Sequence, residues 1–208
     1  MKQLIILSLL ISNFSIAQNT KMPAYDKNDF RLGLKLPHIN HLSLNPDKEF
    51  RDDKFGFNGY GIGFEYNYRK ERFVETSISL VLTFELPFPA PVDREYNRIL
   101  YSYYISLTDN FVKNRFTFGY GINYAVNHRN EFYRNLFLED ISNSDDTYYS
   151  NRDLGLTINA YYRIGKTLHL GIIYRPSLLH IDNGIEPIYE HLVSLELAWK
   201  IRLFNFKS

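Results

Sequence analysis

The side chains that could support chemistry in this sequence are few and dispersed. Six histidines are spread over 208 residues, and only His38 and His41 are close neighbours. Their spacing of three in an extended stretch would place them on opposite faces, so a shared metal ion is not expected. Glu139-Asp140 and Asp145-Asp146 offer oxygen ligands for a hard cation, but solvated loop carboxylates are the simpler interpretation. We therefore predict no metal site and no cofactor.

Familiar catalytic patterns are missing from the sequence. It contains no GxSxG, HExxH, phosphate-binding loop or EF-hand pattern. It also contains no cysteine, which excludes disulfides, thiolate metal sites and a cysteine nucleophile. Lysine and arginine together number 24 against 23 acidic residues, for a net charge of +1, and this balance argues against a nucleic-acid partner.

One histidine stands in a context that could support catalysis. The segment that starts at His180 reads His-Ile-Asp-Asn-Gly, which is similar to the His-x-Ser-Asn segment of outer-membrane lipid A deacylases. That resemblance implies a general-base role for His180, acting on a serine. Asp182 occupies the serine position, however, and Ser177 precedes the histidine, so the nucleophile is missing. Glu186 or Glu190 could orient His180, and a lipid-modifying enzyme is kept as an alternative function.

The secondary structure that would position these side chains follows a pattern that recurs along the chain. Eight segments alternate large apolar residues with small or polar ones, which is the period of a β-strand with one apolar face. No stretch of comparable length has a helical period. The eight segments cover residues 30–36, 60–68, 74–86, 99–108, 116–127, 154–163, 168–175 and 193–203.

The connections between these segments alternate between short and long. Short turns are expected at Arg69 to Glu71, Asn110 to Asn114 and Gly165-Lys166. An up-and-down meander of this kind places all short turns at one end of the sheet and all long loops at the other. The longer, polar connections cover residues 45–54, 87–97, 128–151 and 181–189.

If the eight expected strands close into a barrel, their apolar face has to point outward. It carries most of the large aliphatic and aromatic side chains of the eight segments, and the interior of an eight-stranded barrel is too narrow for them. Aromatic residues make up 16% of the chain, with 17 tyrosines and 16 phenylalanines. Many lie near segment ends, where membrane interfaces favour them. A secreted soluble barrel that binds a small apolar ligand inside is a further alternative.

In strand number, alternation and loop pattern, residues 30–204 resemble the small eight-stranded outer-membrane β-barrels of Gram-negative bacteria, the OmpA/OmpX type. The resemblance implies an all-β fold, an antiparallel up-and-down transmembrane β-barrel with short periplasmic turns and long extracellular loops. The segment from Val193 to Leu203 is similar to the closing strand that such proteins present to the barrel-assembly machinery. Outer-membrane lipids and lipopolysaccharide would surround the barrel.

The first 17 residues predict a secretory signal peptide. Lys2 supplies the positive end, residues 4–14 the apolar run, and Ser15-Ile16-Ala17 the cleavage pattern. The apolar run is shorter than the roughly 20 residues of a spanning helix. Cleavage near Ala17 would leave residues 18–29 as a periplasmic N-terminal lead and residues 30–208 as the outer-membrane β-barrel.

Ten charged residues are predicted to line the lumen. Because an isolated buried charge is costly, they are expected to pair across the lumen and to plug it. A switchable latch or a narrow ion path is the alternative. The ten residues are Arg31, Lys35, Glu65, Glu75, Glu85, Arg163, Arg175, Glu196, Lys200 and Arg202.

The longest connection, His128 to Asn151, is the candidate binding loop, because long loops are often functional. The sequence thus predicts an outer-membrane barrel with a structural role, or with a binding or adhesion role toward an extracellular ligand that the sequence does not identify. The candidate contact residues are Phe132, Tyr133, Phe137, Tyr148 and Tyr149.

Overall fold

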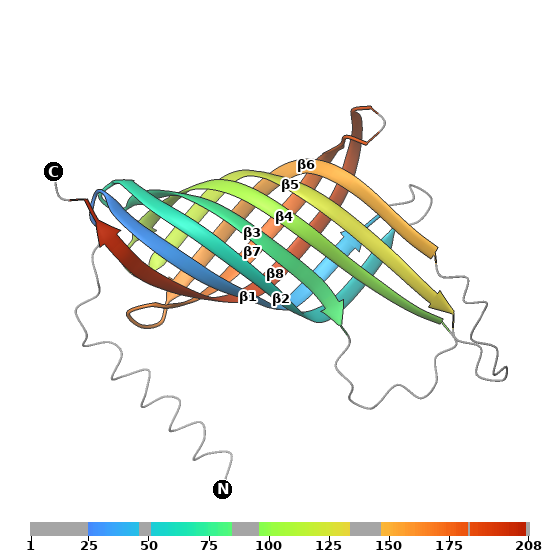
Figure 1. Ribbon diagram of the computed structural model, residues 1–208, viewed down its shortest axis with the longest axis horizontal. Helices are drawn as coiled ribbons and strands as arrows, with labels where there is room; N and C mark the ends of the chain where they lie inside the picture. The colour runs from blue at the N-terminus through green and yellow to red at the C-terminus, as the bar shows by residue number, and fades with distance from the viewer. Residues whose placement is uncertain (1–24, 46–50, 85–95, 134–146, 183, 207–208) are drawn as a thin grey trace, which may run out of the picture.

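The computed structural model describes residues 25–45, 51–84, 96–133, 147–182 and 184–206. They form eight antiparallel strands that pair in sequence order, and the last strand pairs with the first to close a barrel (Figure 1). The predicted all-β, up-and-down fold is confirmed. The strands are β1 (Asp29–Leu44), β2 (Asp52–Arg69), β3 (Arg72–Phe84), β4 (Tyr96–Lys113), β5 (Phe116–Tyr133), β6 (Thr147–Arg163), β7 (Leu168–His180) and β8 (Glu186–Asn205).

The short connections all lie at one end of the barrel, which we call the short-turn end. Residues 70–71 join β2 to β3, residues 114–115 join β4 to β5, and residues 164–167 join β6 to β7. Both ends of the described chain are also here, and the Phe206 N–H donates to the Asn28 carbonyl oxygen at 3.2 Å. The opposite end is the long-loop end.

Within the described residues, no helix has the length and apolarity that a membrane crossing would require.

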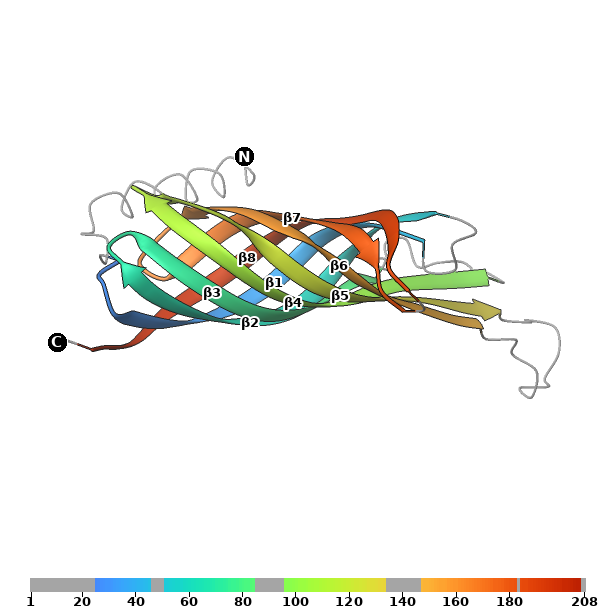
Figure 2. The same cartoon turned by 90° about the horizontal axis from the view of Figure 1, so that it is seen from above.

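Several strands extend further toward the long-loop end than the alternation predicted. β2 begins at Asp52 instead of residue 60, and β5 and β6 stay paired as far as Glu131 and Thr147. These extensions are polar and therefore lack the apolar period on which the prediction depended. The loops predicted at residues 45–54 and 128–151 are correspondingly shorter. Figure 2 shows that β4, β5 and β6 reach farthest at this end. We call the projecting parts of these three strands the β4–β6 extension.

The apolar faces of the strands point outward and form a continuous belt. Seven isoleucines, one from each of strands β2 to β8, are 39–61% exposed. Apolar side chains in such a belt are stabilised by lipid hydrocarbon and are unfavourable in water. A soluble barrel has the opposite arrangement, so the belt contradicts the secreted soluble alternative. The seven isoleucines are Ile62, Ile78, Ile105, Ile122, Ile158, Ile172 and Ile201.

The barrel interior is filled by side chains, and they are not all polar. Two apolar clusters fill the space between the charged groups, where the sequence pattern had indicated mostly small polar residues. Large inward side chains are accommodated because the residues beside them on the same face are small. The first cluster contains Leu42, Leu44, Val81, Leu100, Tyr104, Ala125 and Leu192, and the second contains Tyr161, Ile173 and Ala198.

Gly171 of β7 makes room for one of these large side chains. It pairs with Tyr161 of β6 and with Glu196 of β8. A Cβ atom at Gly171 would lie only 2.1 Å from the Tyr161 ring. The ring can therefore lie across β7 only because residue 171 has no side chain.

We expect Gly171→Ala to lower the free energy of unfolding by about 1–3 kcal/mol, because the new methyl group overlaps the Tyr161 ring. Gly165 is the matched control, since a Cβ atom there would have no heavy atom within 4 Å. Gly165→Ala should change stability by less than about 0.5 kcal/mol. Urea unfolding of the barrel in lipid vesicles, followed by the fluorescence of Trp199, compares them. Equal unfolding midpoints would contradict the packing argument.

Candidate functional site

Two lysines and two glutamates form an ion-paired group inside the barrel, which we call the lumen tetrad. Lys200 Nζ contacts Glu65 Oε1 and lies 3.9 Å from Glu75 Oε2, and Lys35 Nζ contacts Glu75 Oε1. The four side chains are only 1–3% exposed. Glu65 and Glu75 are direct partners in the β2–β3 register. The lysines therefore neutralise two carboxylates that would otherwise repel each other in a poorly solvated interior.

Aromatic side chains flank the lumen tetrad. Lys200 Nζ lies 4.9 Å from the ring centroids of both Phe73 and Tyr161, a distance at which a ring attracts an ammonium group. The Tyr161 hydroxyl donates a hydrogen bond to Glu196. Neither ring was among the predicted site residues. The sequence did contain the signal for them. Positions 74 and 162 carry outward apolar residues, so the alternation places their neighbours at 73 and 161 inward.

Tyr25 packs inside the barrel at the short-turn end. Its buried ring lies 3.7 Å from the Arg31 guanidinium carbon and stacks on Phe73 at 5.6 Å. Its hydroxyl is 3.3 Å from His169 Nε2, and its carbonyl oxygen accepts the Glu71 N–H at 3.0 Å. Desolvation raises the pKa of the Tyr25 hydroxyl above its ordinary value of 10.0. The end of the predicted N-terminal lead thus packs inside the barrel.

The other predicted lumen residues lie at different heights. Arg31 pairs with Asp29 at 3.3 Å, and the Arg163 guanidinium carbon lies 5.5 Å from the Tyr25 ring, both at the short-turn end. The buried Arg175 lies further up, 4.7 Å from the Tyr104 ring.

Two of the ten charged residues predicted to line the lumen are not found inside it in the described part of the chain. Arg202 lies at the rim of the short-turn end, where its side chain is 45% exposed and pairs with Asp29 at 2.6 Å. The β1–β8 register shifts next to this position, between Phe30 and Arg31, and the shift disturbs the regular alternation. Glu85 lies outside the described residues.

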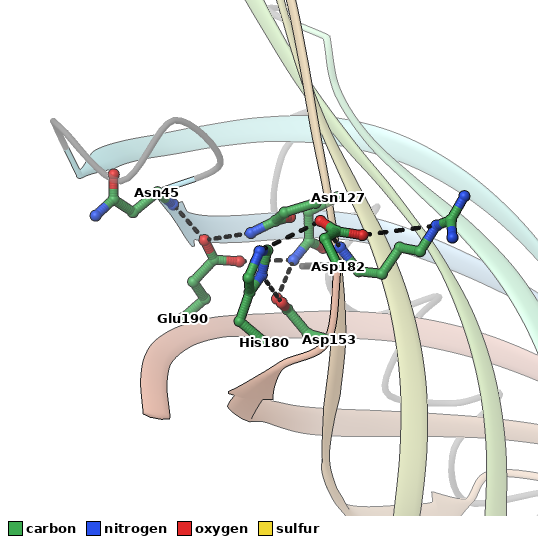
Figure 3. A network of polar contacts seen from close by, with 8 residues as sticks. Asn45, Asn127, Asp153, His180, Asp182 and Glu190 are labelled. Carbon is green, nitrogen blue, oxygen red and sulfur yellow. Dashed lines mark hydrogen bonds and ion pairs between the residues drawn. The ribbon is translucent and has the colours of Figure 1, made fainter. Parts of the chain in front are cut away.

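A second polar cluster lies at the long-loop end, around His180 (Figure 3). His180 Nδ1 is 3.0 Å from Asp153 Oδ1, and Nε2 is 3.3 Å from Asp182 Oδ2. In the described part of the chain, neither ring nitrogen has a hydroxyl group as a hydrogen-bond partner. Since a general base needs its nucleophile within hydrogen-bond reach, this geometry gives no support to deacylase chemistry.

Glu190 is a buried carboxylate that joins several strand ends (Figure 3). Its Oε1 accepts hydrogen bonds from the Asn45 backbone N–H at 2.6 Å and from Asn151 Nδ2 at 3.0 Å. Its Oε2 accepts one from Asn127 Nδ2 at 2.6 Å, and Asn127 Nδ2 also lies 2.7 Å from Asp153 Oδ2. Glu190 is fully buried, and these three donors supply hydrogen bonds to its carboxyl group. Its contacts indicate a structural role in connecting β5, β6 and β8 to the chain that leaves β1.

The two neighbouring histidines lie on the same face, and the prediction of opposite faces was wrong. A register shift after Pro37 adds a residue to the alternation of β1. The His38 ring lies 6.3 Å from Phe57, and the His41 ring lies 4.3 Å from Phe55, on the outer face of β2. Across the described ranges, no group of three or more His, Cys, Asp or Glu side chains is arranged to hold a metal ion.

The predicted binding-loop residues lie mainly on strands. Phe132 and Tyr133 are the last residues of β5, and Tyr148 and Tyr149 lie near the start of β6. Phe137 lies outside the described residues, as do the acidic pairs at 139–140 and 145–146. The region is thus in part a hairpin of the β4–β6 extension.

Four ion-paired residues connect the strands near the end of this extension, and we call them the outer ion cluster. Arg129 Nη1 lies 3.1 Å from Asp52 Oδ2, and Arg129 Nε lies 3.1 Å from Glu131 Oε1. Arg98 contacts Asp52 and lies 3.5 Å from Glu131 Oε1. The Arg129 guanidinium carbon also lies 4.4 Å from the Tyr149 ring. Strands β2, β4, β5 and β6 are therefore tied together above the apolar belt.

The closed ring, the outward apolar belt and the filled interior together define the fold of a small outer-membrane β-barrel. Among solved structures, the chain is similar to Ail, the attachment invasion locus protein of Yersinia pestis, with a TM-score of 0.54 and 8% identity over 84% of this chain and 99% of Ail. It is also similar to Neisserial surface protein A, with a TM-score of 0.46 and 11% identity over 84% of this chain and 97% of that one. At such low identity the likeness to Ail shows the fold alone. No protein-family model and no curated protein sequence matches the chain.

We expect Lys200→Met to lower the free energy of unfolding by about 3–5 kcal/mol, because it leaves the Glu65 carboxylate buried without its cation. Adding Glu65→Gln should restore part of that loss, so the double variant should be more stable than the sum of the single effects implies. Urea unfolding in lipid vesicles measures these differences. Lys166→Met, in an exposed turn, is the control, and a Lys200 variant as stable as this control would show that the tetrad does not stabilise the barrel.

Proposed function

We propose that this protein is an integral outer-membrane barrel that presents its long-loop end to the cell exterior as a binding or adhesion surface. The observation that carries the proposal is the belt of exposed apolar side chains around a closed barrel with a filled interior. A closed ring leaves no unpaired strand edge, as lipid hydrocarbon requires. The short turns then face the periplasm and the long loops face outward.

The β4–β6 extension supplies the proposed binding surface. It stands beyond the apolar belt and is stiffened by the outer ion cluster. Tyr148 contacts His128 through its hydroxyl and remains largely exposed, and Tyr149 lies against Arg129. Tyrosine is one of the side chains that most often dominate binding energy at interfaces. Arg129, which is only 4% exposed, supports Tyr149 and is not itself a contact residue. The name of Ail refers to attachment by that protein. For this chain, the proposal of adhesion is supported by the β4–β6 extension.

We also propose that the lumen is plugged. Tyr25 and Arg31 fill the short-turn end, the lumen tetrad lies above them, and the apolar cluster around Leu192 separates the tetrad from Glu190. An eight-stranded barrel is only just wide enough for its side chains, so these groups leave no continuous path for ions.

The route to the membrane is part of the same proposal. Residues 1–17 are removed as a signal peptide near Ala17, and the barrel-assembly machinery inserts the chain through β8, next to outer-membrane lipids and lipopolysaccharide. This is supported by the apolar run at residues 4–14 and by the alternation of β8. Residues 1–24 lie outside the described part of the chain.

Protease sites inserted in turn at the two ends of the barrel test the orientation. A site placed in residues 134–146 should be cut in intact cells, because it lies outside the cell. A site placed in the β6–β7 turn, at residues 164–167, should be cut only after the outer membrane is permeabilised. Uncut protein in the outer-membrane fraction should run faster on gels before heating than after. Recovery in the soluble fraction, or cutting of the 164–167 site in intact cells, would overturn the proposal.

Planar-bilayer recording tests the plug. We expect the inserted barrel to show no stable conductance steps, because the lumen is filled by ion-paired and apolar side chains. Insertion is verified separately by the gel shift on heating. Reproducible steps from inserted protein would show that the lumen conducts.

A further inference from the structure

A group of cationic side chains surrounds a shallow hollow on the outer wall at the short-turn end, away from the proposed binding surface. The hollow has a volume of about 450 Å³ and lies where β2, β3 and β4 reach their turns. Four of the residues around it are cationic and one is acidic. Its main lining residues are Arg69, Lys70, Glu71, Arg72, Phe111 and Lys113, and we call it the basic hollow.

The strand register places the basic hollow directly beside the apolar belt. Arg72 is the cross-strand partner of Phe111, and Phe111 is the partner of Phe118. The rings of Phe111 and Phe118 are 5.5 Å apart, and Phe116 stacks on Phe118 at 6.0 Å. These three rings are 38–48% exposed. Cationic groups and lipid-facing rings therefore lie next to each other on one surface.

Acidic groups near the basic hollow are few. Tyr68 donates a hydrogen bond to Asp109 Oδ1 at 2.9 Å, and Asp109 is the cross-strand partner of Val74, two residues along β3 from the exposed Arg72. Asp109 and Glu71 balance only part of the charge of the four cations. The basic hollow therefore keeps an excess of positive charge.

This combination of charge and apolar surface fits one kind of ligand. Phosphate oxygens accept paired hydrogen bonds from a guanidinium group and are attracted by the nearby lysines. Acyl chains attached to that phosphate would extend over the Phe111 and Phe118 rings. Free phosphate would gain only the first contact, and an uncharged lipid only the second.

We propose that the basic hollow binds the headgroup of an anionic phospholipid, such as phosphatidylglycerol, in the leaflet that surrounds the short-turn end. The inference rests on the membrane insertion proposed above. It adds a specific lipid site at the end opposite the loops, where the bound lipid would link the β2–β3 and β4–β5 turns to the bilayer surface.

A tryptophan placed next to the basic hollow can report which lipid occupies it. Trp199, the only tryptophan, is replaced by phenylalanine, and Phe118→Trp introduces the reporter without changing the lining of the hollow. The protein is refolded in phosphatidylcholine vesicles that contain a small fraction of brominated phosphatidylglycerol or brominated phosphatidylcholine. We expect the brominated phosphatidylglycerol to quench the reporter more strongly, with a preference of roughly fivefold for each cation that contacts the phosphate at low ionic strength.

Variants that remove positive charge test whether the preference for phosphatidylglycerol depends on the basic hollow. Arg69→Gln alone should reduce it, and Arg69→Gln with Arg72→Gln should reduce it further, leaving only the contribution of Lys70 and Lys113. Lys166→Gln, a matched exposed lysine in another turn at the same end, should leave it unchanged. Equal quenching by both lipids, an undiminished preference in the double variant, or an equal loss with Lys166→Gln would overturn the inference. Inorganic phosphate that displaces phosphatidylglycerol at an equal concentration, compared at constant ionic strength, would show that the acyl chains add nothing and would overturn it too.

The gel shift on heating separates the two proposals. A barrel that does not insert into vesicles at all contradicts the proposed function. A barrel that inserts and shows no lipid preference contradicts only the lipid site. Each variant is therefore compared with the parent protein for insertion before quenching is measured.

Discussion

The pairing of β8 with β1 is the interaction on which the rest of the structure depends. It runs from Asp29 opposite Asn205 to Ser43 opposite His191 and turns an open sheet into a ring. In hydrocarbon, an unpaired row of backbone N–H and C=O groups would be prohibitively costly, so the apolar belt is compatible with this fold only if the ring is closed. Closure also makes the interior narrow, and this decides what the inward side chains can be.

Charges inside so narrow a ring have to be arranged in pairs. Glu65 and Glu75 face each other on β2 and β3, and Lys200 reaches them from β8, on the far side of β1. The same strand pairing that excludes lipid therefore brings together charges that are far apart in the sequence. The buried Glu190 follows the same rule at the other end, where three donors replace its lost water. The interior is best understood as the internal support of a scaffold.

The two ends of that scaffold present different chemistry. At the long-loop end, the outer ion cluster supports strands that project beyond the belt and carry the tyrosines of the proposed binding surface. At the short-turn end, Tyr25 packs inside the barrel and the basic hollow lies beside the apolar belt. The two proposed roles, contacts in solution at one end and contacts with lipid at the other, depend on this difference. This division follows from a meander in which short and long connections alternate.

The sequence by itself determined the strand count, the outward direction of the apolar face and the alternation of turns and loops, because each depends on a local period of two. It also singled out Lys35, Glu65, Glu75 and Lys200, since parity alone places them inward. Only the tertiary structure decided which charge meets which, because partners such as Lys200 and Glu65 are set by ring closure and register. It also decided what local alternation cannot encode: the bulge that turns His38 and His41 to one face, the polar strand extensions, and the insertion of Tyr25. In each of these, contacts between distant segments override the local pattern.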